Sequence, residues 1–331
     1  MDILILGGTV FLGRHLVETA QSRGHRLTLF NRGRSNPGLF PDVEQIHGDR
    51  AADLDRLGNR RWDAVIDTSG YLPAQVRAAA GALARRAGLY VFISTISVYA
   101  DFTRPHMDEN APLARLDDPE ETALDHETYG ALKTHCEDAV LAALLDRALI
   151  IRPGLIAGPH DPTDRFTYWP VRMAQGGELL APESPGVPVQ FIDARDLAAW
   201  TLACLEQGTT GVYNATGPAA PYTLGELLAV CRQATATDAT PVWVDADFLA
   251  DQGVSPFVDM PLWVPDALRG ISTVDCRRAL AAGLTFCPVQ ATVADTLHWR
   301  RNLPDNLPLR AGLPPEREAS LLAAWHRRYL R

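Results

Sequence analysis

Short apolar runs alternate with amphipathic segments through the first half of the chain. Buried strands are predicted at residues 2–6, 26–30, 43–47, 64–67, 89–94 and 148–152. Helical patterns lie between them at residues 11–23, 51–57, 73–87 and 127–145. Gly24 and Gly88 are expected to end the first and third of these helices. Apolar strands that alternate with helices predict a doubly wound parallel α/β sheet covered on both faces.

The pattern changes after residue 152. Residues 153–188 are rich in proline, glycine, aspartate and aromatic residues, and a strand at 189–192 with a helix at 194–206 is expected to return to the sheet. Shorter elements follow at 223–233, 241–244, 276–282 and 289–301. We therefore assign residues 1–157 and 188–207 to the sheet domain, and residues 158–187 and 208–331 to a smaller, C-terminal substrate-binding lobe.

Composition and charge exclude several classes of protein. The chain has 331 residues, 47% of them hydrophobic and 21% charged, and no apolar run reaches the roughly 18 residues of a membrane helix. The net charge of −9 argues against a nucleic-acid partner. Five cysteines without C-x-x-C spacing indicate neither disulfides nor a zinc site, so a cytoplasmic protein is expected.

The first predicted strand leads into a glycine-rich turn and then a helix. The turn contains Gly7, Gly8, Thr9, Val10, Phe11, Leu12 and Gly13. Glycines permit a tight turn, and a helix N-terminus offers free N–H groups to a pyrophosphate. We interpret this as the dinucleotide-binding turn of a Rossmann domain; the alternative is an ordinary turn between a strand and a helix.

The second strand ends without the acidic residue that usually binds the ribose of NAD. Asn31 stands there, followed by Arg32, Arg34 and Ser35, which suit a 2′-phosphate. NADP is therefore preferred over NAD as the cofactor, although the same residues would also suit a solvated basic turn. Asp49 and Arg50 are expected either to flank the adenine or to cap the next helix.

The only lysine of the chain stands four residues after a tyrosine. The other 30 of the 31 basic residues are arginines, so Lys133 marks a position where an ammonium is preferred. Its spacing from Tyr129 puts both side chains on one helical face. An ammonium nearby is expected to lower the pKa of the phenol, which makes Tyr129 a candidate general acid and base. The alternative is a surface tyrosine beside a solvated lysine.

These features together resemble the extended short-chain dehydrogenase/reductase superfamily, also called the NAD-dependent epimerase/dehydratase family. The shared segments are the glycine turn, F-I-S-T-x-S-V-Y, the Tyr129/Lys133 pair, I-I-R-P-G at 150–154 and F-I-D-x-R-D at 191–196. The resemblance implies that Thr95 is the catalytic hydroxyl. It further implies that a set of neighbouring residues contacts the cofactor: Thr68, Ser69, Gly70, Ser94, Lys133, Pro153 and Gly154.

The chain departs from the family pattern at three places. Val10 replaces the middle glycine, as in the atypical branch that includes chloroplast stem-loop-binding proteins. Ile96 and Ser97 replace the acidic pair of sugar-nucleotide dehydratases, so dehydration is not expected. Gln190 stands where sugar-nucleotide enzymes usually carry an arginine, which puts the usual grip on a diphosphate in doubt.

The loop after residue 157 carries the remaining candidates. It is expected to face the active site with an apolar wall and two cations; with Ser97, the predicted substrate residues are His160, Arg165, Phe166, Tyr168 and Trp169. Phe257, Met260 and Trp263 are further candidates. Core packing of the small lobe explains the aromatic residues equally well. No residue stands at a ligand spacing to His160, so no metal is expected.

These observations favour an NADP(H)-dependent oxidoreductase, a reductase or dehydrogenase of a small carbonyl or alcohol. The alternative is an NAD-dependent sugar-nucleotide epimerase, which oxidises and re-reduces its substrate. A further alternative is a non-catalytic nucleotide- or RNA-binding relative. The expected partner is a small-molecule substrate rather than nucleic acid or membrane, and the protein is expected to be a monomer or homodimer.

Overall fold

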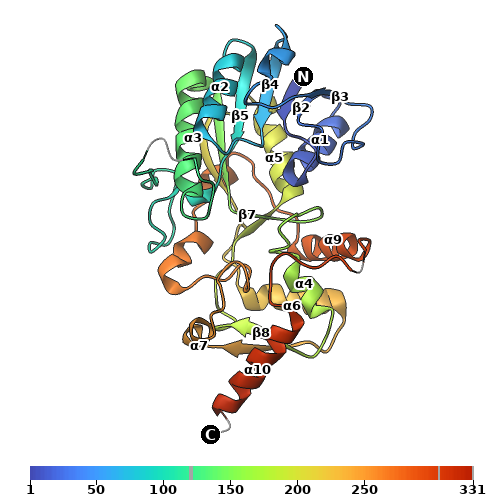
Figure 1. Cartoon of the computed structure of the whole chain (residues 1–331), viewed down its shortest axis with the longest axis vertical. Helices are drawn as coiled ribbons and strands as arrows, with labels where there is room; N and C mark the ends of the chain where they lie inside the picture. Colours follow the sequence, from blue (N-terminus) through green and yellow to red (C-terminus); the bar gives the residue numbers. More distant parts are fainter. Residues whose placement is uncertain (119–121, 305, 330–331) are drawn as a thin grey trace.

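A seven-stranded parallel sheet forms the upper part of the molecule (Figure 1). The computed structural model describes residues 1–118, 122–304 and 306–329. Neighbouring strands follow the order β10-β6-β5-β4-β1-β2-β3, and all of these pairs are parallel. The strands are β1 Asp2–Leu6, β2 Arg26–Asn31, β3 Glu44–His47, β4 Trp62–Asp67, β5 Ala87–Ile93, β6 Ala148–Pro153 and β10 Gly211–Ala215. This order confirms the predicted doubly wound, Rossmann-type sheet.

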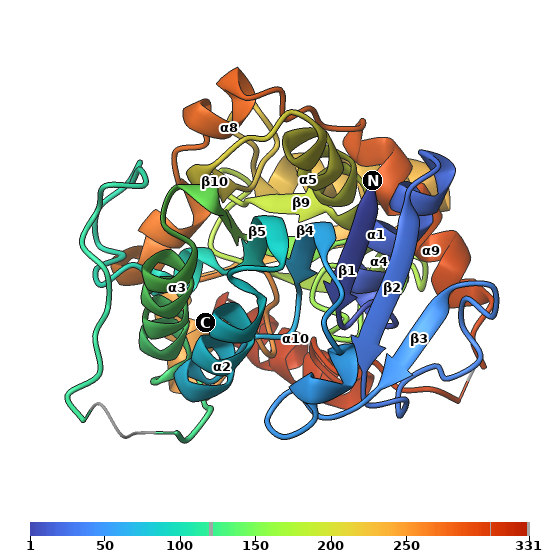
Figure 2. The same ribbon diagram turned by 90° about the horizontal axis from the view of Figure 1, so that it is seen from above.

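Helices cover both faces of the sheet. On one face α2 (Pro73–Leu83) packs beside α3 (Tyr129–Leu144), and on the other α1 (Phe11–Ser22) packs beside α5 (Ala194–Glu206). Figure 2 shows α2 and α3 on one side of the strands and α5 on the opposite side. The sheet is therefore the middle of three layers, with an apolar core on each side of it.

The composition of β1 follows from this double burial. Ile3 and Ile5 pack into the core under α1, whereas Leu4 and Leu6 pack into the core under α2. Successive side chains of a strand point to opposite faces, so a strand covered on both sides is apolar throughout. Each such side chain contributes about 1.5–3 kcal/mol on burial, which makes β1 a rigid support for the turn that follows it.

A second lobe with its own apolar core lies below the sheet. Its elements are α4 Tyr168–Met173, β8 Glu178–Pro182, α6 Leu224–Thr235, β11 Thr240–Val244, α7 Ala246–Asp251, α9 Val289–Arg301 and α10 Pro315–Tyr329. The strands β8 and β11 pair in parallel, and α10 runs from this lobe to the C-terminal end of the molecule. No helix in the described ranges is long and apolar enough to cross a membrane.

Further short elements complete the fold. They are β7 Leu155–Ala157, β9 Phe191–Asp193, α8 Arg277–Ala281 and the 3-10 helices η1 Leu54–Leu57, η2 Ile96–Val98, η3 Leu145–Arg147 and η4 Asp266–Ser272. The segment η4 is joined to the sheet domain by the Gly270 N–H, which donates to the Phe102 carbonyl at 2.9 Å. The two lobes are thus linked at several places in the chain.

The strand expected to return to the sheet near residue 190 does not do so. That strand, β9, pairs with β7 in a separate two-stranded sheet. The seventh strand of the main sheet is instead β10, from a segment that the sequence analysis placed in the small lobe. The reason is the order of the elements. The strand β9 leads directly into α5, whose N-cap is Asp193. The chain reaches the free edge of β6 only after this helix, and there it forms β10.

Two local predictions were also wrong. The helix expected at 51–57 is reduced to the single 3-10 turn η1. The helix expected to reach residue 87 ends at Leu83, and Gly88 lies inside β5 rather than at a helix end. A Cβ at Gly88 would lie 2.5 Å from the carbonyl oxygen of Asp63. Close approach of two backbones, rather than helix termination, therefore accounts for this glycine.

Candidate active site

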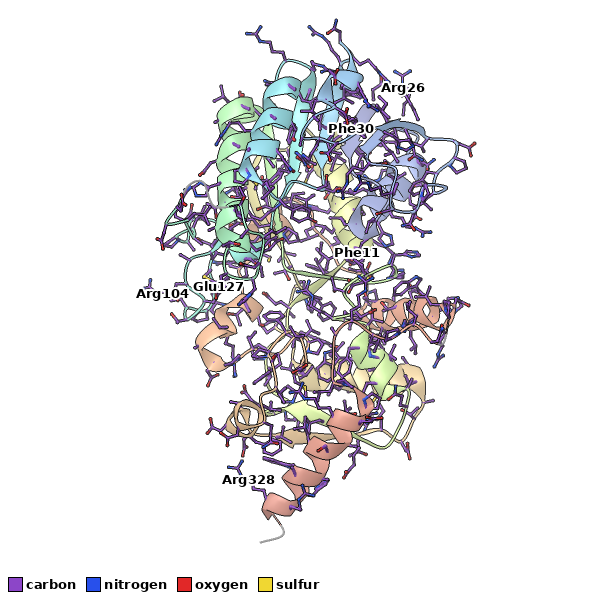
Figure 3. All side chains as sticks on the ribbon, in the orientation of Figure 1. Phe11, Arg26, Phe30, Arg104, Glu127 and Arg328 are labelled. Atoms are coloured by element: carbon purple, nitrogen blue, oxygen red, sulfur yellow. The ribbon has the colours of Figure 1, made fainter. Side chains whose placement is uncertain are left out.

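A cleft of about 1360 Å³ lies at the carboxyl ends of the strands, between the sheet and the second lobe. Residues after β1, β2, β4, β5 and β6 line one side, and residues of the second lobe line the other. Figure 3 shows Phe11 and Glu127 at the ends of α1 and α3 that face the second lobe. A doubly wound sheet places ligands at this edge, so the cleft is the candidate active site.

The glycine turn forms the floor of the cleft beside β1. Gly7 and Gly8 have φ angles of +114° and +99°, which L side chains rarely adopt. A Cβ on Gly7 would also lie 2.4 Å from Thr68 Oγ1, and one on Gly13 would lie 2.9 Å from the Gly8 nitrogen. Val10, where the family pattern has glycine, has φ of −129°, which any residue tolerates. The departure at Val10 therefore leaves the turn intact.

The first turn of α1 is open to a ligand. No side chain caps this helix at Val10, so its first N–H groups keep their hydrogen-bonding capacity. Thr9, Val10, Phe11 and Leu12 all line the cleft. An uncapped helix N-terminus above a glycine turn binds phosphate through its N–H groups and its dipole.

The turn after β2 presents two cations at the rim. Asn31 holds the turn by accepting from the Gly33 N–H at 2.8 Å and donating to the Gly7 carbonyl at 3.4 Å. Arg32, Arg34 and Ser35 line the cleft and are exposed. In the part of the chain that the structure describes, neither guanidinium has a carboxylate partner. Both are free to meet a phosphate.

Arg50 and Asp49 are held by other protein groups. Arg50 donates to both carboxylate oxygens of the buried Asp67, at 2.8 and 2.7 Å. Burial by itself would raise the pKa of the Asp67 carboxyl. The charge and hydrogen bonds of Arg50 outweigh burial and hold this pKa below its ordinary value. Asp49 accepts from the Ala51 N–H at 2.9 Å. Both residues reach the edge of the cleft, yet their polar groups serve mainly to stabilise the segment after β3.

Thr95, Tyr129 and Lys133 meet in the same cleft. Thr95 follows β5 and caps η2 by accepting from the Ser97 N–H at 3.1 Å. Tyr129 is the first residue of α3, and Lys133 stands one turn later on the same face. The sequence thus brings a hydroxyl from a strand end to a phenol and an ammonium from one helix.

Lys133 is held in place by two backbone carbonyls. Its Nζ donates to Gly70 O at 2.8 Å and to Ile93 O at 2.7 Å, and lies 4.0 Å from the ring centroid of Phe92. The residue is only 2% exposed, and this burial lowers the pKa of its ammonium to about 8. Gly70 itself does not line the cleft and contributes through its carbonyl.

The pKa of Tyr129 differs from the sequence-based expectation. Burial, reinforced by Tyr71, raises the pKa of the phenol to about 12, whereas a hydrogen bond with Thr95 and the charge of Arg165 act to lower it. Lys133 is not among the main influences on this pKa; its ammonium donates to the two backbone carbonyls. The expected lowering of the Tyr129 pKa by Lys133 is therefore absent from the protein chain by itself.

Ser94 offers a polar group that the protein does not satisfy. Its hydroxyl is buried, lines the cleft and has no hydrogen-bond partner within the described residues. Buried hydroxyls nearly always have a partner, so a ligand atom is the natural acceptor or donor here. Pro153 and Gly154 lie on the neighbouring strand end and also line the cleft.

Most of the predicted substrate residues in the loop after β7 point elsewhere. Phe166, Tyr168 and Trp169 are at most 2% exposed and form part of the second lobe's core. Trp169 Nε1 donates to the Pro261 carbonyl at 3.0 Å. His160 packs between His15 and Trp299, outside the cleft. The prediction of an aromatic substrate wall was wrong for these residues, because their side chains pack into the second lobe's core or against other aromatic rings instead of lining the cleft.

Ser97 and Arg165 do line the cleft, and so does Phe257, whereas Met260 and Trp263 are buried in the core. Several well-exposed apolar residues that were not predicted from the sequence also line the cleft: Tyr71, Leu124, Val258 and Leu268. No periodic pattern marks them, since they lie in irregular segments and a 3-10 helix. Gln190, also in the cleft, exchanges two hydrogen bonds with the backbone of Val274, at 3.0 and 2.8 Å.

Comparison with known proteins identifies related chains. The model of the NAD dependent epimerase/dehydratase family matches residues 3–216. The chloroplast stem-loop binding protein of 41 kDa b from Arabidopsis thaliana is 30% identical over 239 residues, which cover 65% of this chain and 58% of the plant protein. The epimerase family protein SDR39U1 from Bos taurus is 27% identical over 244 residues, covering 68% of this chain and 78% of the relative.

Among solved structures, the fold resembles that of UDP-N-acetylglucosamine 4-epimerase from Bacillus cereus. The TM-score is 0.66, with 19% identity and coverage of 93% of this chain and 99% of the other. At this identity the likeness concerns the fold. The chain spans less than two thirds of the plant relative, so the activity of that whole protein does not transfer by similarity.

Proposed function

The chain belongs to the NAD-dependent epimerase/dehydratase family, and we propose that it oxidises and reduces a secondary alcohol carbon of a small substrate. The observation that carries the proposal is the meeting of Thr95, Tyr129 and Lys133 in one cleft with the glycine turn. A phenol, a hydroxyl and an ammonium that share a cleft with a dinucleotide-binding turn can transfer a proton to or from a carbonyl oxygen.

The residues of the cleft fit a nicotinamide dinucleotide. The glycine turn and the uncapped N-terminus of α1 would hold its pyrophosphate. The Ser94 hydroxyl, which has no hydrogen-bond partner among the described residues, would contact the inner part of the dinucleotide. The nicotinamide ring supplies and takes up the hydride when it is bound. An ammonium has three N–H donors, and Lys133 uses two on protein carbonyls, which leaves one for a ligand.

Tyr129 carries the proton in this proposal. Its phenol gives a proton to the substrate oxygen during reduction and removes it during oxidation. Thr95, whose hydroxyl acts to lower the pKa of Tyr129, would orient the same oxygen. The positive charge of Arg165 favours the phenolate, so the side chains around Tyr129 already oppose part of the effect of its burial.

An epimerase cycle is the first candidate reaction. In such a cycle the alcohol is oxidised to a ketone, the ketone turns its opposite face to the dinucleotide, and the same dinucleotide reduces it. The family and the epimerases among the similar proteins favour this reading. The cofactor then returns to its starting state after each turnover.

A reductase that consumes NADPH is the second candidate. Arg32 and Arg34, exposed and without carboxylate partners in the described residues, favour a dinucleotide with a 2′-phosphate. Stem-loop binding, named for the plant relative, is not favoured, because a net charge of −9 argues against an RNA partner.

Tyr129→Phe tests the proposed chemistry. We expect this variant to bind NADPH and NADH as the wild type does but to lose turnover by about 10²–10⁴-fold, since the proton carrier is gone. Turnover is measured on panels of UDP-sugars and of aromatic and aliphatic ketones. Tyr222→Phe, which removes a half-buried phenol of the second lobe, is the matched control and should keep full activity. Full activity of Tyr129→Phe would refute the assignment.

The fate of the cofactor separates the two candidate reactions. An epimerase is expected to purify with dinucleotide bound and to interconvert UDP-sugars without net change in absorbance at the NADH wavelength. A reductase is expected to oxidise NADPH stoichiometrically with a ketone. Acid extraction of the purified protein, followed by chromatography of the nucleotides, gives the first measurement.

A further inference from the structure

Arg165 presents a cation to the substrate side of the cleft. It lies in the loop between β7 and α4, and its side chain lines the cleft. Its Nε donates to Thr163 Oγ1 at 3.3 Å. Across residues 1–118, 122–304 and 306–329, no carboxylate lies within ion-pair distance of its guanidinium. The two terminal nitrogens therefore keep their donors for a ligand.

The guanidinium is oriented by a chain of hydrogen bonds from a buried acid. Asp161, 1% exposed, accepts at one oxygen from the N–H and from the hydroxyl of Thr163, both at 2.8 Å. Thr163 in turn accepts from Arg165 Nε. Asp161 Oδ2 is buried without a partner in the described residues, although the residue lines the cleft. A substrate hydroxyl would satisfy that oxygen.

Arg165 and Tyr129 line the same cleft. Burial dominates the pKa of the Tyr129 phenol, and the charge of Arg165 acts to lower that pKa. A group bound to Arg165 therefore shares the cleft with the carbon on which Tyr129 works.

Exposed apolar side chains line the same cleft as Arg165. Val258 and Leu268 are 57% and 45% exposed, and both line the cleft together with Phe257. Leu124, 53% exposed, faces the same space from the segment before α3. Large apolar side chains gathered in one cleft indicate a ligand with an apolar surface.

We infer that the substrate is a secondary alcohol or ketone with an anionic group near the reacting carbon and an apolar body beyond it. The anion, a carboxylate or a phosphate, pairs with Arg165, and the apolar body covers Val258 and Leu268. This inference rests on the proposed function, because it places the reacting carbon at Tyr129. Thr163 and Asp161 are positioning residues that fix the guanidinium.

This substrate class differs from a nucleotide sugar. A sugar ring presents several hydroxyl groups, and the apolar side chains of Phe257, Val258 and Leu268 offer them no hydrogen bonds. Gln190 is no substitute for a diphosphate-binding side chain, since its amide is already bonded at both ends to Val274. An epimerase or a reductase of an acidic, partly apolar molecule fits both observations.

The test compares an acid with its neutral amide. Binding of 3-phenylpropanoate and of 3-phenylpropanamide to the NADPH complex is measured by titration calorimetry. The wild type should bind the acid at least about tenfold more tightly, as a charge-assisted hydrogen bond predicts. Arg165→Met should remove this preference, and Arg165→Lys should keep part of it. Arg104→Met, which removes an exposed arginine outside the cleft, is the matched control and should keep all of it.

Further probes separate the remaining possibilities. Phenyl phosphate in place of the acid shows which of the two anions Arg165 prefers. Leu268→Ser should weaken the acid and the amide equally. If Arg165→Met no longer binds NADPH, Thr163→Val serves instead and should reduce the preference for the acid by several-fold.

Two results would overturn the inference. One is equal affinity of the wild type for acid and amide. The other is tighter binding of UDP-glucose than of the acid, with no effect of Arg165→Met on the UDP-glucose affinity. Failure of the proposed chemistry is distinguishable, because Tyr129→Phe should lose turnover while its affinity for 3-phenylpropanoate stays unchanged.

Discussion

The inner face of the cleft and its rim differ in how many partners each functional group already has within the protein. On the inner face, Gly7 is pressed against Thr68, and the Lys133 ammonium is bonded to two carbonyls. On the rim, Arg32 and Arg34 are exposed and lack carboxylate partners among the described residues. Groups with many protein partners are positioned before any ligand arrives, whereas groups with few depend on the ligand for their interactions.

This difference indicates which residues are constrained by their contacts within the fold. An inner residue cannot change without leaving a neighbour displaced or unpaired, so substitution there should affect binding of every dinucleotide. A rim residue can change with little effect on the fold and should affect only the ligand that it contacts. The following predictions test this division.

The largest effect is expected for Gly7→Val. The φ of +114° and the 2.4 Å approach of a Cβ to Thr68 Oγ1 force the turn to move. We expect the affinity for NADPH and NADH alike to fall by at least about 100-fold, because the phosphate-binding N–H groups shift with the turn. Fluorescence titration of both dinucleotides measures it.

Gly24→Val is the matched control for that substitution. Gly24 also has a positive φ, of +76°, but a Cβ there meets nothing within 4 Å, and the residue is outside the cleft. It should lower stability by about 1 kcal/mol and leave both dinucleotide affinities unchanged. Equal losses of affinity in the two variants would mean that backbone strain, not the contact with Thr68, is responsible.

An intermediate effect is expected from Lys133, with a pH dependence. Burial lowers the pKa of its ammonium to about 8, so turnover of the wild type should fall as the pH rises through 8. The Tyr129 phenol, with its pKa raised to about 12, stays protonated in this range and does not obscure the effect. Lys133→Met should lose turnover by about 100-fold and show no such decline. A wild-type profile that stays flat to pH 9.5 would contradict the assignment.

Stability should change with pH in the opposite sense. Because the pKa of Lys133 is depressed in the folded protein, the unfolded chain holds this proton to higher pH. This residue therefore adds stability as the pH rises from about 8 towards its unfolded value, and the addition is lost as the pH falls back through 8. Urea unfolding of the wild type and of Lys133→Met at pH 7.5 and pH 9.5 isolates the contribution of Lys133 to the free energy of unfolding. The cysteines titrate in both proteins, so their contribution cancels in the comparison.

The smallest effect is expected at the rim. Replacement of Arg32 and Arg34 together by serine should weaken NADPH binding by about tenfold, the value of losing charge-assisted contacts to a phosphate. NADH binding and the free energy of unfolding should stay nearly unchanged, because both side chains are exposed. The NADPH and NADH dissociation constants of the double variant give the answer. Equal losses of affinity for NADPH and NADH would mean that these arginines act like the residues of the inner face, which affect the binding of every dinucleotide.

Several features were determined by the sequence alone. The apolar runs predicted six strands of the sheet, and the glycine pattern predicted the turn at Gly7, because strands buried on both faces and residues with positive φ leave marks that are local in the chain. The four-residue spacing likewise placed Tyr129 and Lys133 on one helical face. These properties depend on neighbours in sequence.

Other features were decided only by the tertiary structure. An aromatic residue in an irregular loop looks the same whether it packs inward, as Phe166 does, or lines a cleft, as Phe257 does. The pKa of Tyr129 depends on Tyr71, Thr95 and Arg165, which are remote from it in sequence. Burial and charge pairing depend on which segments pack together in the folded protein, and a local sequence pattern does not indicate which segments these are.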